Sequence, residues 1–402
     1  MEQEERPPGA WPARAIGVGI ALVAALAIYW SPLGFEVARA AVLPPHVPPV
    51  SARELYYMNS APSRVDLGAL ARARAAAPAG HTDLVLMGSS ELNYQGPFSP
   101  ADFLRHRVSD FDLFDFGQYG DQSLSHAVEL SALSSKQQLS KVALIVSPQW
   151  FAGKGVNPEA FQHVMSSTLA QGLLDDHTLT PQTRARLISR SAAMWQDDAW
   201  FPHSPRPPSG DVDAAWARRF GVLKDAWATS RATSNVTTGF DVPIDAAPID
   251  SMDWDAEESA ARQAAAAAKT NNEFGIDDRF FDDVYRPRLD ALRASNAKVD
   301  YSGTSREWDD LALFLDVARE HHIKVLLILQ PMNGRWYDYT AYPKERRALF
   351  YDRLRDLARR AGVEFLDTAA HEYDADYMID SMHFGWKGWL DVIHRCATFA
   401  RS

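Results

Sequence analysis

The chain has 402 residues, a formal net charge of −11 and a single cysteine. Its length suits one large α/β domain with insertions, or two domains. The acidic charge and the lack of a long Lys/Arg run argue against a nucleic-acid partner. Because Cys396 has no second cysteine to pair with, we expect no internal disulfide, cysteine-rich zinc site or cysteine nucleophile. We expect no metal ion and no cofactor.

The amino-terminal segment predicts where the chain is located. Residues 15–35 carry no charge, and a bilayer-spanning helix needs about 20 such residues. Arg6 and Arg14 precede this run, and positive residues favour the cytoplasmic side. We predict a cytoplasmic tail at 1–14, a transmembrane anchor at 15–35 and an extracytoplasmic remainder. A cleaved signal peptide is the alternative, because residues 38–40 read Ala-Arg-Ala, and it also exports the remainder.

The rest of the chain reads as a proline-rich linker at 36–55 and one extracytoplasmic domain at 56–402. Short β-rich runs alternate with helical patterns, which predicts a doubly wound parallel sheet with helices on both faces. The expected strands are 83–87, 111–116, 142–146, 324–329 and 363–366. A polar stretch at about 152–310 predicts a mostly helical insertion. The expected fold class is α/β, with three layers, this insertion and one N-terminal transmembrane helix.

The first predicted strand ends in Gly88-Ser89-Ser90-Glu91. Parallel sheets bind ligands at the carboxyl ends of their strands, and this turn places a serine at that edge of the sheet. Gly88 allows the backbone to turn, and the hydroxyl and N–H of Ser90 are candidates for a nucleophile and an oxyanion donor. The alternative is that Ser89 or Ser90 only caps the next helix.

The next two strands end in candidate oxyanion donors. Gly117 and Gly120 follow the second strand and offer bare backbone N–H groups, although an ordinary glycine turn is the alternative. Gln149 follows the third strand and brings a side-chain amide to the same edge of the sheet.

Asp380 and His383 lie just before the last predicted helix. A histidine accepts the proton of a serine, and an aspartate three residues earlier fixes its tautomer. The other histidines considered, His126, His321 and His322, read as structural or surface residues.

The serine turn, the glycines, Gln149 and the Asp–His pair occur in the order found in the SGNH/GDSL hydrolase-like superfamily, which the chain resembles. Ser89 stands in place of the Asp of that superfamily, and Gln149 in place of its usual Asn. Within it the chain resembles the DltD family, the extracytoplasmic proteins of teichoic acid D-alanylation. The motifs that carry this resemblance are 88–92 (GSSEL), 147–151 (SPQWF), 272–276 (NEFGI), 336–338 (WYD), 344–347 (KERR) and 383–389 (HFGWKGW).

The resemblance implies an outward-facing, membrane-anchored O-acyltransferase that esterifies D-alanine to hydroxyls of an anionic envelope polymer. The implied partners are a membrane-bound O-acyltransferase (DltB-like), a D-alanyl carrier protein (DltC-like), supplied by a D-alanine ligase (DltA), and a small membrane peptide (DltX-like). The implied catalytic residues are Ser90, His383 and Asp380. The oxyanion would be held by the N–H groups of Ser90 and Gly120, together with Gln149. Secondary site candidates are Gly88, Ser89, Glu91 and Gly117.

Two other functions remain open. An esterase that removes acyl groups from a surface glycan would use the same apparatus, because only the acceptor differs. A non-catalytic assembly factor of the D-alanylation machinery would not need the intact serine, histidine and aspartate.

Overall fold

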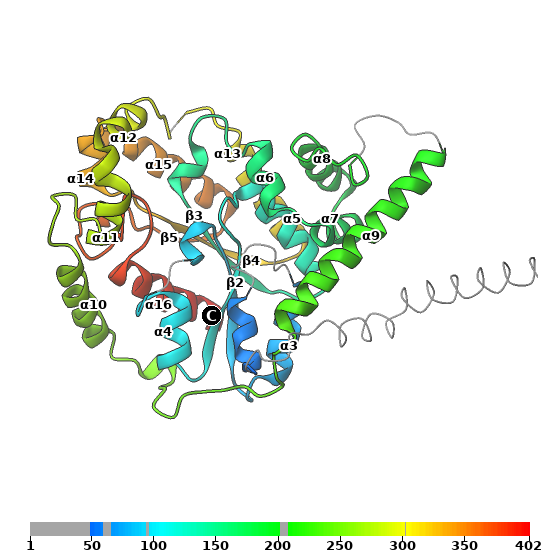
Figure 1. The fold of residues 1–402 in the computed structure, drawn as a ribbon, viewed down its shortest axis with the longest axis horizontal. Helices are drawn as coiled ribbons and strands as arrows, with labels where there is room; N and C mark the ends of the chain where they lie inside the picture. Colours follow the sequence, from blue (N-terminus) through cyan, green and yellow to red (C-terminus); the bar gives the residue numbers. More distant parts are fainter. Residues whose placement is uncertain (1–48, 59–65, 94–95, 202–207, 302) are drawn as a thin grey trace, which may run out of the picture.

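The computed structural model describes residues 49–58, 66–93, 96–201, 208–301 and 303–402. Its five strands form one all-parallel sheet in the order β2-β1-β3-β4-β5 (Figure 1). The strands are β1 Thr82–Met87, β2 Phe111–Phe116, β3 Lys141–Val146, β4 Lys324–Leu329 and β5 Glu364–Leu366. The predicted α/β class and parallel sheet are therefore confirmed. The predicted tail at 1–14 and anchor at 15–35 lie outside the described residues.

The strands form because short runs of β-branched and large apolar residues are buried on both faces of the sheet. All six residues of β2 are buried, as are the last five residues of β3 and of β4. β1 and β2 start in register, with Thr82 opposite Phe111, as do β3 and β4, with Lys141 opposite Lys324, and all four strand pairs are parallel. Their carboxyl ends consequently meet at one edge of the sheet.

Helices cover both faces of the sheet. Helix α5 (Ser123–Ser134) connects β2 to β3 and packs against α13 (Glu307–Glu320), which leads into β4. Helix α16 (Trp386–Arg401) contacts β1 and β4, and α10 (Trp254–Ala268) packs on α16. Parallel strands joined by right-handed crossovers require this covering of both faces.

The segment between β3 and β4 contains helices and, within its described residues, no strand. Its helices include α6 Pro158–Val164, α7 Ser167–Asp175, α8 Pro181–Ala192, α9 Pro208–Thr233, α10 and α12 Leu289–Asn296. Helix α9 packs against α7 and extends from the body of the molecule (Figure 1). The remaining helices are α3 Ala69–Ala76, α4 Pro100–Arg107, α11 Asp278–Phe280, α14 Gly334–Tyr339 and α15 Lys344–Ala361. Among the helices of the described ranges, none combines the length and apolarity that a bilayer span requires.

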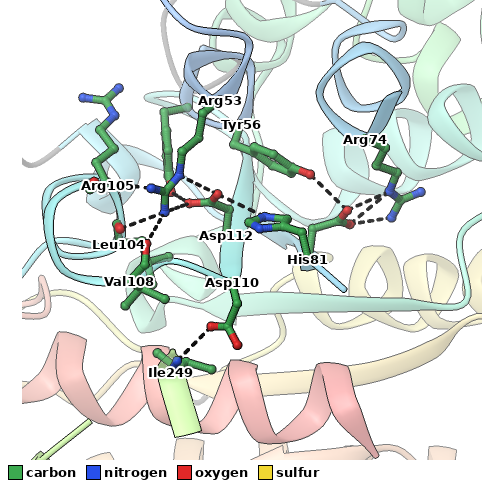
Figure 2. A network of polar contacts seen from close by, with 12 residues as sticks. Arg53, Tyr56, Arg74, His81, Leu104, Arg105, Val108, Asp110, Asp112 and Ile249 are labelled. Atoms are coloured by element: carbon green, nitrogen blue, oxygen red, sulfur yellow. Dashed lines mark hydrogen bonds and ion pairs between the residues drawn. The ribbon is translucent and has the colours of Figure 1, made fainter. Parts of the chain in front are cut away.

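A buried network at the amino ends of the strands, which we call the amino-edge network, ties the short helix η1 (Ala52–Tyr57) to β2 (Figure 2). Asp112 is fully buried, and its carboxylate accepts hydrogen bonds from Arg53 Nε at 2.7 Å and Nη2 at 2.9 Å. Tyr57 donates its hydroxyl to the same carboxylate, and His81 lies 3.2 Å from it. Every charge in this network has a partner, as buried ion pairs require.

Candidate active site

The turn after β1, residues 88–93, carries the candidate nucleophile, and we call it the nucleophile turn. Its last four residues, Ser90–Asn93, form a 3₁₀ helix. Ser90 is half-buried, and its Oγ lies 2.9 Å from Nε2 of His383. The strand, the turn and the loop before α16 thus bring together two residues that lie 293 positions apart in the chain.

Asp380 orients His383. Its Oδ2 lies 2.7 Å from Nδ1 of the imidazole, while Oδ1 accepts the backbone N–H groups of Met382 and His383 at 2.8 Å each. Asp380 is 5% exposed, so both oxygens are held by protein groups rather than water. The structure therefore places Ser90, His383 and Asp380 in one hydrogen-bonded chain, the geometry of a Ser-His-Asp triad.

The pKa values of His383 and Asp380 depend on their burial and on the charges around them. Burial alone would lower the pKa of His383, but the charge and hydrogen bond of Asp380, and the charge of Glu91, raise this pKa to about 9. Burial would raise the pKa of Asp380, but the charge of His383 and the hydrogen bonds that it accepts lower it. The aspartate is thus held as an anion, which stabilises a protonated imidazole.

Two residues that the sequence did not single out hold the loop of Asp380 and His383. The hydroxyl of Tyr285 donates to Ser381 Oγ at 2.8 Å and accepts the backbone N–H of Ser381 at 3.3 Å. The Asn333 side-chain amide donates to the carbonyl oxygens of Asp380 at 3.2 Å and Phe274 at 3.0 Å. The sequence motifs of the family resemblance could have pointed to this contact. Phe274 lies inside one of these motifs, and Asn333 lies three residues before another.

The candidate oxyanion residues lie at the carboxyl edge, where β1, β2 and β3 end side by side. Gly120 has φ +94° in the loop after β2, and Gln149 is half-buried in the short helix Pro148–Phe151 after β3. Gly117 has φ +150°, and a Cβ there would lie 1.9 Å from the carbonyl oxygen of Gly88. The loop after β2 therefore packs directly on the nucleophile turn. The roles of Gly120 and Gln149 stay predictions.

One group of side chains in the described part of the chain has the composition of a metal site. Asp121, His126 and Glu129 are buried, and their candidate ligand atoms lie within 4.8 Å of one another. His126 Nδ1 lies 2.8 Å from Glu129, and burial raises the pKa of this glutamate to about 8. Two carboxyls and one imidazole suit Mn²⁺ or Zn²⁺. Sequence reasoning assigned His126 a structural role and did not group these three residues, because His126 lies within the buried helix α5.

A serine hydroxyl bonded to a histidine that is bonded to a buried aspartate, at the carboxyl edge of a parallel sheet, is typical of serine-dependent hydrolases and acyltransferases.

The chain belongs to the DltD family: the family model described as "DltD protein" matches residues 63–401. It is 25% identical over 327 residues to Protein DltD of Bacillus subtilis (strain 168), covering 77% of this chain and 80% of the relative. It is also 25% identical over 317 residues to Protein DltD of Staphylococcus aureus (strain NCTC 8325 / PS 47), covering 76% and 78%. Protein DltD of Lacticaseibacillus rhamnosus is 23% identical over 339 residues, covering 79% and 77%. The resemblance to the DltD family found in the sequence is confirmed.

Proposed function

We propose that this protein transfers D-alanine to hydroxyl groups of a teichoic or lipoteichoic acid-like polymer through an ester on Ser90. Membership of the DltD family supports the D-alanylation role. The observation that supports a direct chemical step is the contact of 2.9 Å between Ser90 Oγ and His383 Nε2. A serine placed against a base that is itself oriented by a carboxylate is the general arrangement of covalent acyl transfer.

In the first half-reaction, Ser90 Oγ attacks the carbonyl carbon of a D-alanyl donor, and His383 Nε2 takes the serine proton. Asp380 keeps the Nδ1–H of His383 in place and stabilises the imidazolium. The N–H groups of Ser90 and Gly120, with the amide of Gln149, would donate to the oxyanion. His383 then returns the proton to the leaving group as its bond to the acyl carbon breaks, which leaves D-alanyl-Ser90.

In the second half-reaction, a polymer hydroxyl takes the place of the leaving group. His383 removes its proton, the hydroxyl oxygen attacks the Ser90 ester, and Ser90 recovers the proton as the product departs. The base therefore cycles once in each half-reaction, and no cofactor is consumed.

The location and partners of this reaction are part of the proposal. A retained anchor at 15–35 would hold the domain on the outer face of the membrane. There it would receive D-alanine through a DltB-like membrane-bound O-acyltransferase, a DltC-like carrier and a DltX-like peptide. The anionic envelope polymer would be the acceptor.

A deacylating esterase is the second candidate, and one observation favours it. The side chain of His383 is 24% exposed, so water reaches the base that would activate it. Hydrolysis of a Ser90 ester needs no group beyond those of the transfer reaction, so the acceptor alone separates the two functions.

The experiment replaces the chromosomal copy by Ser90→Ala or Ser89→Ala and measures D-alanyl esters on the cell envelope. We expect Ser90→Ala to abolish the esters at unchanged protein level and membrane location. Ser89→Ala should act more mildly, because within the described ranges the Oγ of Ser89 forms one hydrogen bond, to the carbonyl of Gln118 at 3.4 Å. Normal ester content in the Ser90→Ala strain would reject a direct chemical role and favour an assembly factor.

A further inference from the structure

Glu91 follows the candidate nucleophile directly, and it is only 1% exposed. A carboxyl group buried to this degree is costly unless its oxygens are hydrogen-bonded or its charge is compensated. Glu91 meets this requirement at one oxygen only, which separates it from the fully paired Asp380.

The paired oxygen holds the nucleophile turn. Oε1 of Glu91 accepts the backbone N–H of Ser89 at 2.7 Å, so the side chain folds back over the two preceding residues. A Cβ at Gly88 would lie 2.8 Å from this oxygen and 3.1 Å from Cγ of Leu92. Glycine at 88 therefore makes the space that the carboxyl of Glu91 occupies, and the carboxyl in turn fixes the backbone on which Ser90 sits.

The second oxygen, Oε2, is buried and has no hydrogen-bond partner among the residues that the structure describes. Burial raises the pKa of Glu91, while the charges of His383 and His126 and the N–H of Ser89 lower it. His126 in turn faces Asp121, and its Nδ1 lies 2.8 Å from Glu129. His383 in turn interacts electrostatically with two carboxyls, those of Asp380 and Glu91.

We propose that Glu91 is a positioning residue for this reaction, which fixes the turn of Ser90 through Oε1 and stabilises the imidazolium form of His383 through the charge of its free carboxylate oxygen. The inference rests on the proposed function only in taking Ser90 as nucleophile and His383 as base. Asp380 fixes the tautomer of His383 through a hydrogen bond to Nδ1, whereas Glu91 interacts with the charge of the ring without a hydrogen bond to it.

Glu307 offers a matched control elsewhere in the fold. It is fully buried at the start of α13, its Oε1 accepts the backbone N–H of Ser123 at 2.7 Å, and its Oε2 has no partner in the described residues. It thus repeats the local pattern of Glu91, but His383 is not among the groups that affect its pKa.

The test measures the rate at which a fluorophosphonate labels Ser90, as a function of pH, in the full-length protein and its variants. In this reaction Ser90 Oγ bonds to phosphorus, fluoride leaves, and His383 takes the serine proton. Glu91→Gln keeps an acceptor for the N–H of Ser89 but removes the charge. Glu91→Ala removes both, and Glu307→Gln removes the matched carboxyl.

The labelling rate rises with pH as His383 loses its proton. We expect Glu91→Gln to move this rise, the acid limb of the pH profile, to lower pH by about one unit, because the imidazolium loses a stabilising charge. Its plateau rate should fall about threefold to tenfold, because the base is weaker. Glu91→Ala should lose more of the plateau rate, and Glu307→Gln should leave both limb and plateau at wild-type values.

A wild-type pH profile in Glu91→Gln overturns the proposal, as does an equal shift in Glu307→Gln, which would indicate a general effect of removing buried carboxyls. Both outcomes leave the proposed function standing, because the wild-type protein still labels at Ser90. A wild-type protein that does not label at Ser90 overturns the proposed function and this inference together.

Discussion

The two ends of the sheet handle buried charge in opposite ways. At the amino ends of the strands, Asp112 is compensated by Arg53 and Tyr57, and the Nη2 of Arg53 also donates to the carbonyls of Leu104 at 2.9 Å and Val108 at 2.7 Å (Figure 2). Asp83, the neighbour of Asp112 across the sheet, is likewise bonded to Arg74. The carboxylates of the amino-edge network are therefore paired with arginines, while the ring nitrogens of His81 have no hydrogen-bond partner among the described residues.

At the carboxyl ends, Glu91, Asp121, His126 and Glu129 form a buried group that we call the carboxyl-edge cluster. In the described ranges, neither Lys nor Arg pairs with any of its three carboxyls. One oxygen of Glu91, one of Asp121 and Nε2 of His126 have no hydrogen-bond partner in those ranges.

The amino-edge network serves the stability of the fold, and the carboxyl-edge cluster serves the candidate site. Carboxylates paired with arginines stabilise the fold, whereas buried carboxyls without a cationic partner cost stability and are retained where they serve a site. The carboxyl-edge cluster includes Glu91 of the nucleophile turn, and the amino-edge network lies at the other end of the strands. Variants at the two ends should accordingly change different measurements.

The largest effect is expected at the triad. His383→Ala should slow acylation of Ser90 because the base is lost. Asp380→Asn should slow it by a factor on the order of 10⁴, because the imidazole then takes the wrong tautomer. Neither should change the fold as judged by circular dichroism. Pre-steady-state labelling of Ser90 measures the rate, and a loss smaller than about tenfold in both variants would speak against general-base catalysis.

The next effect is expected at the amino edge. Arg53→Met should lower the free energy of unfolding by about 3–5 kcal/mol, because it leaves the buried Asp112 uncompensated. Urea unfolding measures this loss. Arg53→Met combined with Asp112→Leu should recover much of it, while the labelling rate of the folded protein stays at the wild-type value. An Arg53→Met variant that keeps its stability but loses labelling would show that the amino-edge network serves the reaction and not the fold.

A smaller effect is expected from pH. Because the pKa of His383 is raised from 6.5 to about 9 in the fold, its interaction with Asp380 stabilises the folded state fully below about pH 6.5. This contribution should be lost as the pH rises towards 9, while the labelling rate rises over the same range as the imidazole becomes neutral. Unfolding of the wild type and of His383→Gln at several pH values measures the first trend. A difference between the two proteins that grows with pH would contradict the assignment.

The smallest effect is expected behind the catalytic loop. Tyr285→Phe removes the hydroxyl that bonds to Ser381, which should cost about 1 kcal/mol of stability and slow labelling only a few-fold. Thermal unfolding and the labelling rate measure the two quantities. A loss of labelling as large as that of His383→Ala would mean that Tyr285 takes part in the chemistry itself.

The same division explains what the sequence predicts. All five strands were predicted, because short apolar runs that end in Gly, Pro or Asp carry a local signal. Ser90, Asp380 and His383 were identifiable because strand ends and a close Asp–His pair mark them. Glu91 was named only as a secondary candidate, since no local pattern shows that its side chain folds back onto Ser89. The contact of Tyr285 with Ser381 spans 96 residues, and such pairings are set by tertiary packing.

The most direct test of the central claim is intact-protein mass spectrometry of the wild type after incubation with a D-alanyl thioester. We expect a mass increase of one alanyl residue on the wild-type protein, located at Ser90 and absent from Ser90→Ala. We also expect that the adduct decays faster with added teichoic acid-like polymer than in buffer, with D-alanine appearing on the polymer. Decay that is indifferent to the polymer and releases only free D-alanine would assign an esterase, and the absence of any adduct on Ser90 would contradict covalent acyl transfer.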